Sequence, residues 1–100
     1  MPDDRELIEQ ILAGNQQLYS QIIDRYKGKI VTYLYKMIGN MPDAQDLAQD
    51  VFTKTFYLLK DYRPEHKFSS WLYRIASNHC LDEIRRRKRT ERTAIVEEHP

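Results

Sequence analysis

Five consecutive cations, RRRKR, occupy residues 85–89 and are the strongest chemical signal in the sequence. Adjacent like charges repel one another, and a helix end needs only some of them to complement its dipole. Binding to about three or four phosphates would account for the others and would make the interaction steeply dependent on salt. A helix end that only improves solubility is the alternative interpretation. The run therefore predicts a phosphate-binding segment.

Side chains that can contact nucleobases precede this run on the same predicted helix. At about 100° per residue, one face of that helix holds Trp71, Asn78, Asp82, Arg85 and Arg89, with Arg86 at its edge and Arg74 nearby. Amide and carboxylate groups can read the edges of bases. The loop ahead of the helix adds a cation, an aromatic ring and two hydroxyls, from Lys67, Phe68, Ser69 and Ser70. These groups could line a pocket for an unstacked base, although Phe68 and Trp71 could equally close the core over the loop.

A second polar surface is predicted on the helix before this one. Its face opposite the apolar stripe carries Asp46, Gln49, Asp50, Thr53 and Tyr57. A solvated helix face is the ordinary interpretation of this pattern. Carboxylates with an amide between them also suit docking of a helical or basic partner, and the spacing alone does not separate the two.

The elements that position these groups are predicted to be helices, because apolar residues recur at helical spacing and no alternating run indicates a β-strand. The pattern predicts an all-α bundle of about four helices, over residues 3–13, 15–39, 42–60 and 70–89. The stripe of the fourth helix that should face the core is Leu72, Tyr73, Ala76, Cys80 and Ile84.

The expected helix ends follow from local residue types. Gly14 and Gly39 supply stops, Pro42 suits a first turn, and the expected N-caps are Asn15 and either Ser69 or Ser70. The segment DYRPEHKF, residues 61–68, has a proline, mixed charges and no periodicity, so a loop is expected there.

The net charge of +1 conceals an uneven distribution. Residues 1–62 carry seven Lys/Arg against nine Asp/Glu, whereas residues 63–93 carry nine against four. The basic part of the chain is therefore the part that holds the predicted loop and fourth helix.

Several classes of protein are not expected. Cys80 is the only cysteine, so an intrachain disulfide is impossible and a cytosolic location is the simple interpretation. No apolar run approaches the ~20 residues that span a bilayer, and the acidic N-terminus is unlike a signal peptide. Three separated histidines offer no metal-ligand spacing, and no arrangement of catalytic side chains is visible. Neither a cofactor, a metal nor an enzyme activity is predicted.

Two runs resemble a known family. PDAQDLAQDVFTKTF (42–56), followed by KFSSWLYRIASNHCLDEIRRRKR (67–89), is similar to region 2 of bacterial sigma factors, and most similar to the small extracytoplasmic-function (group 4) class. The specific motifs are D-L-x-Q-[DE], then F-S-x-W-L-x-R-I-x-x-N, then a basic helix end. The resemblance covers about residues 5–90.

The resemblance implies a role for each polar surface. In the family, the first motif binds the clamp helices of the RNA polymerase β′ subunit, which implies polymerase contacts at Asp46, Leu47, Gln49 and Asp50, with Thr53 possible. The loop and the next helix capture a flipped non-template base of the promoter −10 element, which implies DNA contacts at Lys67, Phe68, Ser69, Ser70, Trp71 and Asn78. Asp82, Arg85 and Arg86 would line the DNA path further along. A membrane-anchored anti-sigma factor commonly covers the same surfaces in this class.

The resemblance also predicts the domain organisation. Residues 1–90 would form the region 2 domain and residues 91–100 would begin the linker to a second domain, which reads the −35 element in the family and is absent here. The loop 61–68 corresponds to the variable specificity segment, so the −10 sequence is not implied. Two alternatives remain open: a helical interaction module without a DNA role, and a fragment of a repressor that reads duplex DNA.

Overall fold

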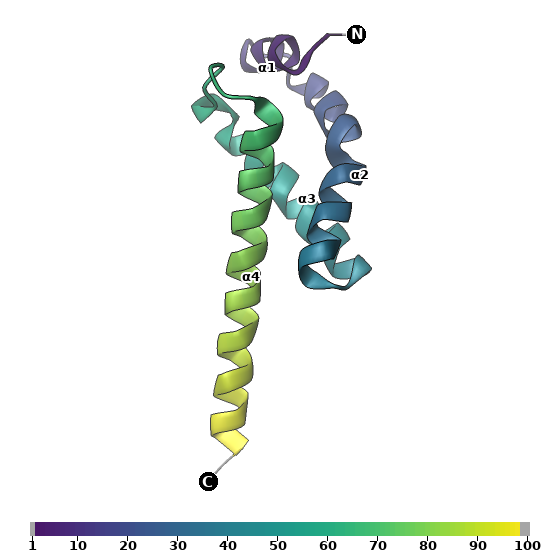
Figure 1. Cartoon of the computed structure of the whole chain (residues 1–100). Helices are drawn as coiled ribbons and strands as arrows, with labels where there is room; N and C mark the ends of the chain where they lie inside the picture. The colour runs from purple at the N-terminus through teal and green to yellow at the C-terminus, as the bar shows by residue number, and fades with distance from the viewer. Residues whose placement is uncertain (1, 99–100) are drawn as a thin grey trace.

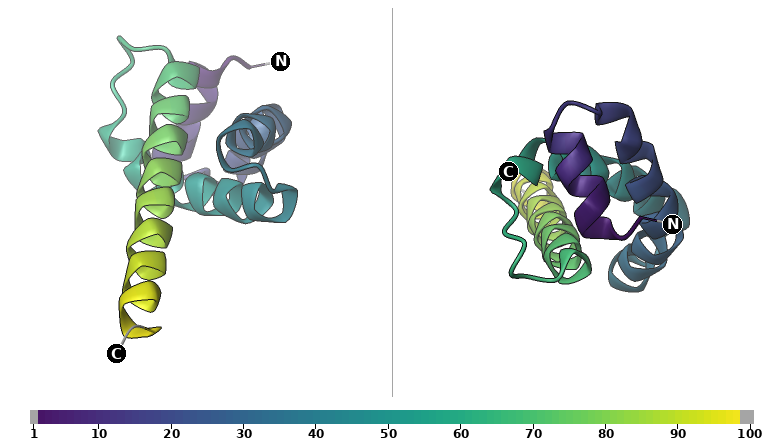
Figure 2. Two further views of the ribbon diagram at one scale, coloured as in Figure 1. Left: turned by 60° about the horizontal axis from the view of Figure 1, so that its bottom comes forward. Right: turned by 90° about the horizontal axis from the view of Figure 1, so that it is seen from above.

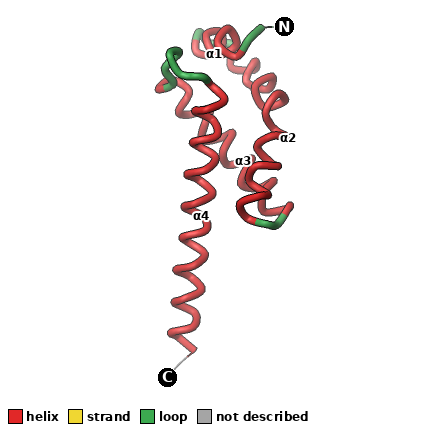
Figure 3. The backbone as a smooth tube through the Cα atoms, in the orientation of Figure 1, coloured by secondary structure: helices red, strands yellow, loops and turns green. Residues whose placement is uncertain are grey.

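The computed structural model of the chain describes residues 2–98, with side chains described up to residue 92. Four α-helices and two short 3-10 helices make up the described part, which contains no strand (Figure 3). Their bounds are α1 Asp4–Leu12, η1 Gln16–Leu18, α2 Tyr19–Ile38, α3 Met41–Leu58, η2 Leu59–Asp61 and α4 Phe68–Glu98. The all-α prediction of four helices is confirmed.

The helices form a bundle from which α4 projects. In Figure 1, α2 and α4 run side by side, α1 lies across their upper end, and α3 passes behind them from the lower end of α2 to the loop before α4. The view from above in Figure 2 shows the same covering position of α1. Because α4 continues past the other helices, the molecule measures 60 × 23 × 23 Å.

Local capping explains where α3 begins. Gly39 ends α2 in the left-handed region at φ 74°, which glycine adopts without steric cost. The next residue, Asn40, is extended, and its Oδ1 accepts a hydrogen bond from the Asp43 amide at 2.9 Å. The predicted stop at Gly39 and the place of Pro42 in the first turn are therefore confirmed.

Two predicted N-caps are wrong. Asn15 has φ −85° and ψ 63°, which is not the extended geometry of an α-helical N-cap, and its side chain makes no capping hydrogen bond. It precedes the 3-10 helix η1, and α2 begins only at Tyr19. The fourth helix begins at Phe68, so Ser69 and Ser70 lie inside its first turn rather than before it.

The predicted end of the fourth helix, residue 89, is also wrong. Residues 90–98 contain neither glycine nor proline, and α4 continues through them to Glu98. The expected linker 91–100 is thus helical as far as residue 98, and residues 99–100 lie outside the described part. The division between domain and linker stays a prediction.

The core lies where α4 packs against α2 and α3. Leu72, Ala76 and Cys80 are each 0% exposed, as the predicted apolar stripe requires. Their fully buried partners on the other two helices are Ile22, Ile30, Leu34, Ala44 and Val51. Tyr19 closes the far side of the core, and its hydroxyl donates a hydrogen bond to the Phe52 carbonyl at 2.6 Å. This burial raises the pKa of Tyr19.

The two asparagines provide a matched test of the capping assignment. Asn40→Ala should lower the free energy of unfolding by about 1 kcal/mol, because the Asp43 amide loses its acceptor. Asn15→Ala should change it by less than about 0.5 kcal/mol, since that side chain caps nothing. Urea denaturation followed by circular dichroism measures both values, and equal losses would contradict the assignment.

Candidate nucleic-acid interface and docking face

A polar hollow of about 460 Å³ lies between the loop and the start of α4, and we call it the loop hollow. Four of the predicted DNA-contacting residues line it: Lys67, Ser70, Trp71 and Arg74. The loop contributes further lining residues that the sequence did not single out: Asp61, Arg63, Glu65 and His66. Mixed charges around the loop proline were the only signal that could have indicated them.

An aromatic cluster holds the loop against α4. The Tyr62 ring lies 5.2 Å from Trp71 and 5.6 Å from Phe68, and its hydroxyl donates a hydrogen bond to the His66 carbonyl. Burial raises the pKa of Tyr62 above its ordinary value. Packing and this hydrogen bond together fix the shape of the loop hollow.

Phe68 lies outside the lining of the loop hollow. Its side chain is 3% exposed and packs between Tyr26, Tyr62 and Trp71, so the ring supports the loop, and its contact with DNA stays a prediction. Ser69 is half-buried and also stays outside the lining. Trp71 is half-buried as well, but part of its ring borders the hollow.

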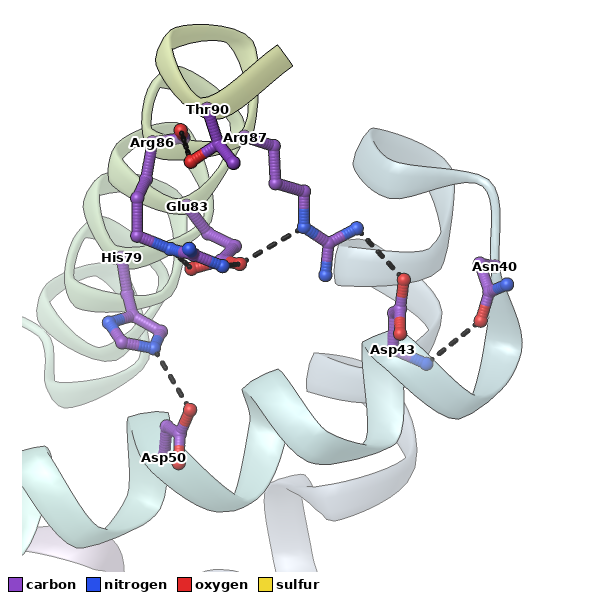
Figure 4. Close-up of polar contacts among 8 residues, drawn as sticks. All are labelled: Asn40, Asp43, Asp50, His79, Glu83, Arg86, Arg87 and Thr90. Carbon is purple, nitrogen blue, oxygen red and sulfur yellow. Dashed lines mark hydrogen bonds and ion pairs between the residues drawn. The ribbon is translucent and has the colours of Figure 1, made fainter. Parts of the chain in front are cut away.

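Two arginines of the basic run, Arg86 and Arg87, bond carboxylates of α4 and α3 (Figure 4). Glu83 accepts hydrogen bonds from Arg86 at 2.6 and 3.1 Å and from Arg87 at 3.0 Å. Arg87 also bonds Asp43 of α3 at 2.9 Å, which ties the middle of α4 to the start of α3. These guanidinium groups, Arg86 first, lower the pKa of Glu83 to about 2. Arg86 and Arg87 therefore already have carboxylate partners in the protein.

The rest of the predicted DNA face points outward. Asn78, Asp82, Arg85 and Arg89 are exposed on α4, and Arg85 lies 3.6 Å from Asp82. Arg74 is exposed one helical turn before Asn78, so the loop hollow and this outer face adjoin.

The predicted docking face lies on α3. Asp46, Gln49, Asp50 and Thr53 are exposed there, whereas Leu47 is 5% exposed and packs in the core, and its contact with a partner stays a prediction. The Asp50 carboxylate approaches the His79 ring of α4, at 3.4 Å between Oδ2 and Nε2 (Figure 4).

An apolar groove of about 610 Å³ borders this face between α2 and α3. Gln49, Thr53 and Tyr57 of the predicted face line one side of it, together with two aromatic residues that were not predicted there, Phe52 and Phe56. Tyr57 is 71% exposed, which is unusual for a large ring. The docking face thus combines carboxylates with an open apolar surface.

The described residues also bear on metal binding, thiol reactivity and membrane crossing. They hold no group of His, Cys, Asp and Glu side chains that could bind a metal ion. The Cys80 thiol is buried, which raises its pKa and disfavours the reactive thiolate. Among the described helices none is long and apolar enough to cross a membrane.

The fold is an all-α domain with two polar surfaces, one formed by the loop hollow and the outer face of α4 and the other by the exposed face of α3. Its family follows from comparison with known proteins: the family described as Sigma-70 region 2 matches residues 22–90. The chain belongs to this family, and the resemblance predicted from the two motifs is confirmed.

Its relatives are sigma factors of the extracytoplasmic-function class. The ECF RNA polymerase sigma factor SigW of Bacillus subtilis is 39% identical over 84 residues, which are 84% of this chain and 45% of SigW. The ECF RNA polymerase sigma-E factor of Escherichia coli K12 is 31% identical over 75 residues, which are 75% of this chain and 39% of that protein. The chain thus spans less than half the length of these relatives.

Two solved structures share the fold. One is the NMR structure of an engineered region 2 of sigmaE in complex with GTAAAA, with a TM-score of 0.82, 28% identity and coverage of 89% of this chain and 93% of that one. The other is CnrH in complex with the cytosolic domain of CnrY, with a TM-score of 0.67, 32% identity and coverage of 79% and 51%.

The Glu83 cluster predicts a pH dependence of stability. Because the pKa of Glu83 is lowered from 4.5 to about 2, its carboxylate stabilises the fold fully above the unfolded-state pKa. This stabilisation is lost as the pH falls toward about 2. The difference in unfolding free energy between the protein and Glu83→Gln should be largest above about pH 5 and disappear below about pH 2. Urea denaturation across this range measures it, and a constant difference would contradict the assigned contacts.

Proposed function

We propose that this domain captures unpaired bases of the non-template strand of a promoter −10 element in the loop hollow, while the exposed face of α3 docks on the β′ clamp helices of RNA polymerase. The observation that carries the proposal is the loop hollow itself, which combines the aromatic Trp71 with the cations Lys67 and Arg74. A domain with the same fold forms a complex with the oligonucleotide GTAAAA.

The loop hollow suits one unstacked base in size and chemistry. Its volume of about 460 Å³ falls within the range of about 300–1,000 Å³ found for small-ligand sites. Stacking on an aromatic ring contributes about 1–3 kcal/mol per base, which offsets the few kcal/mol that unstacking costs. Lys67 and Arg74 would neutralise neighbouring phosphates, and the amide of Asn78 would contact a base edge.

Docking would combine electrostatic attraction with the burial of apolar surface. The carboxylates of Asp46 and Asp50 would meet cations of the clamp helices, and the groove beside Phe52 and Phe56 would receive an apolar side chain. Docking and base capture use different helices, so both could occur in one complex. Promoter melting then follows from trapping the unpaired strand while the polymerase holds the duplex.

Two further roles belong to this proposal. CnrH, which shares this fold, is seen with the cytosolic domain of CnrY, and this supports an anti-sigma partner for the present domain. Contact with RNA polymerase would place the domain in the cytoplasm.

Base capture is tested with fluorescently labelled single strands, starting with GTAAAA and scrambled hexamers. Trp71→Ala should weaken binding of the preferred strand by about 5–150-fold, the equivalent of 1–3 kcal/mol of stacking. Asn78→Ala, at an exposed position, should reduce the preference among strands without changing the melting temperature. The exposed aromatic Tyr57 supplies the control, because Tyr57→Ala should leave DNA binding unchanged.

Two outcomes would contradict base capture. If every hexamer binds with equal affinity, binding depends on attraction to phosphates alone. If Trp71→Ala and Asn78→Ala both bind as the unmodified protein does, the DNA does not bind in the loop hollow. Clamp binding without DNA binding would favour the helical interaction module.

Docking is tested by pull-down with a β′ clamp-helix fragment. Asp50→Lys should abolish binding, since it places a cation against a basic partner at the centre of the docking face. Asp24→Lys makes the same charge change at an exposed position of α2 and should bind normally. If the Asp50 variant still binds, the docking face is assigned to the wrong surface.

A further inference from the structure

A second hollow lies at the seam between α2 and α4, and neither sequence motif includes it. Its volume is about 350 Å³, and we call it the seam hollow. Its lining comes from one face of α2 and one ring of α4: Gly28, Lys29, Thr32, Tyr33, Lys36 and Tyr73. Figure 1 shows these two helices side by side.

Aromatic rings form the floor of the seam hollow. Tyr33 and Tyr73 meet edge to face, with ring centroids 5.0 Å apart and an interplanar angle of 85°. The Tyr33 hydroxyl lies 3.3 Å from the Ser77 hydroxyl, which orients the ring. Both rings are half-buried, so each packs on the core side and leaves part of its surface open. A Cβ added at Gly28 would have no neighbour within 4 Å, so this end of the hollow is open.

Cations surround these rings without nearby carboxylates on the same helix. Between Asp24 and Asp43 the sequence contains four Lys/Arg and no Asp/Glu, a basic stretch that the negative total of residues 1–62 conceals. Lys29, Thr32 and Lys36 follow one another at helical spacing and are exposed on one face. Arg25 precedes them on that face, but it bonds Asp4 at 3.0 Å. Lys29 Nζ lies over the Tyr26 ring, 6.0 Å from its centroid, and neither Lys29 nor Lys36 forms an ion pair with a described residue. Both charges can therefore meet an anion.

The seam hollow adjoins the loop hollow. Tyr73 lies on α4 within one turn of Ser70 and Arg74, which line the loop hollow. Three residues advance about 4.5 Å along a helix, which is less than the reach of one or two nucleotides. A strand that leaves the loop hollow past Arg74 would meet Tyr73 next.

We infer that the seam hollow is a second subsite for single-stranded DNA, which holds the nucleotides adjoining the captured base. One base stacks against the Tyr33–Tyr73 pair, and Lys29 and Lys36 neutralise the phosphates beside it. Aromatic rings within a basic groove are the combination that binds single strands with little sequence preference. This inference rests on the proposed capture of a base in the loop hollow, and it extends the DNA path from α4 onto α2.

Strand length provides the test. Two hexamers that carry the captured base at their 5′ or their 3′ end are each compared with strands that continue four nucleotides beyond that base, using fluorescence anisotropy at several salt concentrations. For the unmodified protein, one of the extended strands should bind about tenfold tighter and with a steeper salt dependence. The double variant Lys29→Gln/Lys36→Gln should lose this gain and keep its affinity for the hexamer, and its salt slope should fall by about 0.7 per lost phosphate contact.

A charge-matched control separates the subsite from general attraction. Lys27→Gln/Lys54→Gln removes two exposed lysines that lie outside the seam hollow, so it should retain the gain from extension. An extension of abasic nucleotides keeps the phosphates but removes the bases, and it should recover only part of the gain. A 2-aminopurine base in the extension should change its fluorescence on binding the unmodified protein and not with Tyr33→Leu.

The outcomes distinguish this inference from the proposed function. If the hexamer binds with sequence preference but extension adds nothing, or if both double variants lose the gain equally, the second subsite is contradicted and base capture stands. If the seam variant weakens the hexamer as much as the extended strand, the lysines act only through general attraction and the inference is wrong. If no strand binds, both proposals fail.

Discussion

Complete burial of Leu72, Ala76 and Cys80 is the constraint on which the other surfaces depend. This stripe fixes the rotation of α4 about its axis, and each neighbouring residue is turned by about 100°. One flank then faces α2, where Tyr73 meets Tyr33, and the other faces α3, where His79 approaches Asp50. The remaining side, with Arg74 and Asn78, is left to solvent. A rotation of one residue would expose the core and bury the cations, so packing energy enforces the orientation of the DNA face.

Cations have two separate uses in this fold. The pairs Arg25–Asp4 and Arg87–Asp43 join helices whose sequence positions lie far apart, and Glu83 holds Arg87 from within α4. These groups already have partners and hold elements in place. The cations around the two hollows, Lys29 and Lys67 among them, lie on the surface and border aromatic rings instead. The basic run 85–89 is therefore partly structural. Lys29 and Lys36 on α2 add a basic surface that the composition of the sequence alone does not reveal.

Helical periodicity predicted the part of the fold that depends on local pattern. The four helices, the buried stripe of α4 and the stop at Gly39 all follow from spacing and from the conformational freedom of glycine. Helical periodicity could not predict interactions between residues that are distant in the sequence. The Arg87–Asp43 pair joins residues 44 positions apart, and the burial of Phe68 depends on Tyr26 and Tyr62 from two other segments. The motifs located both polar surfaces, but only the packing of α2 against α4 reveals the seam hollow.

The account assigns DNA and polymerase to different helices, and nuclear magnetic resonance of the labelled domain tests this most directly. Backbone amide shifts would be recorded on titration with a single-stranded −10 oligonucleotide and, separately, with a β′ clamp-helix fragment. The account predicts that the oligonucleotide shifts signals of residues 63–78 and of the α2 face that includes Lys29 and Lys36, whereas the fragment shifts residues 46–57. Overlapping sets of shifted residues, or DNA-dependent shifts confined to residues 85–89, would contradict it.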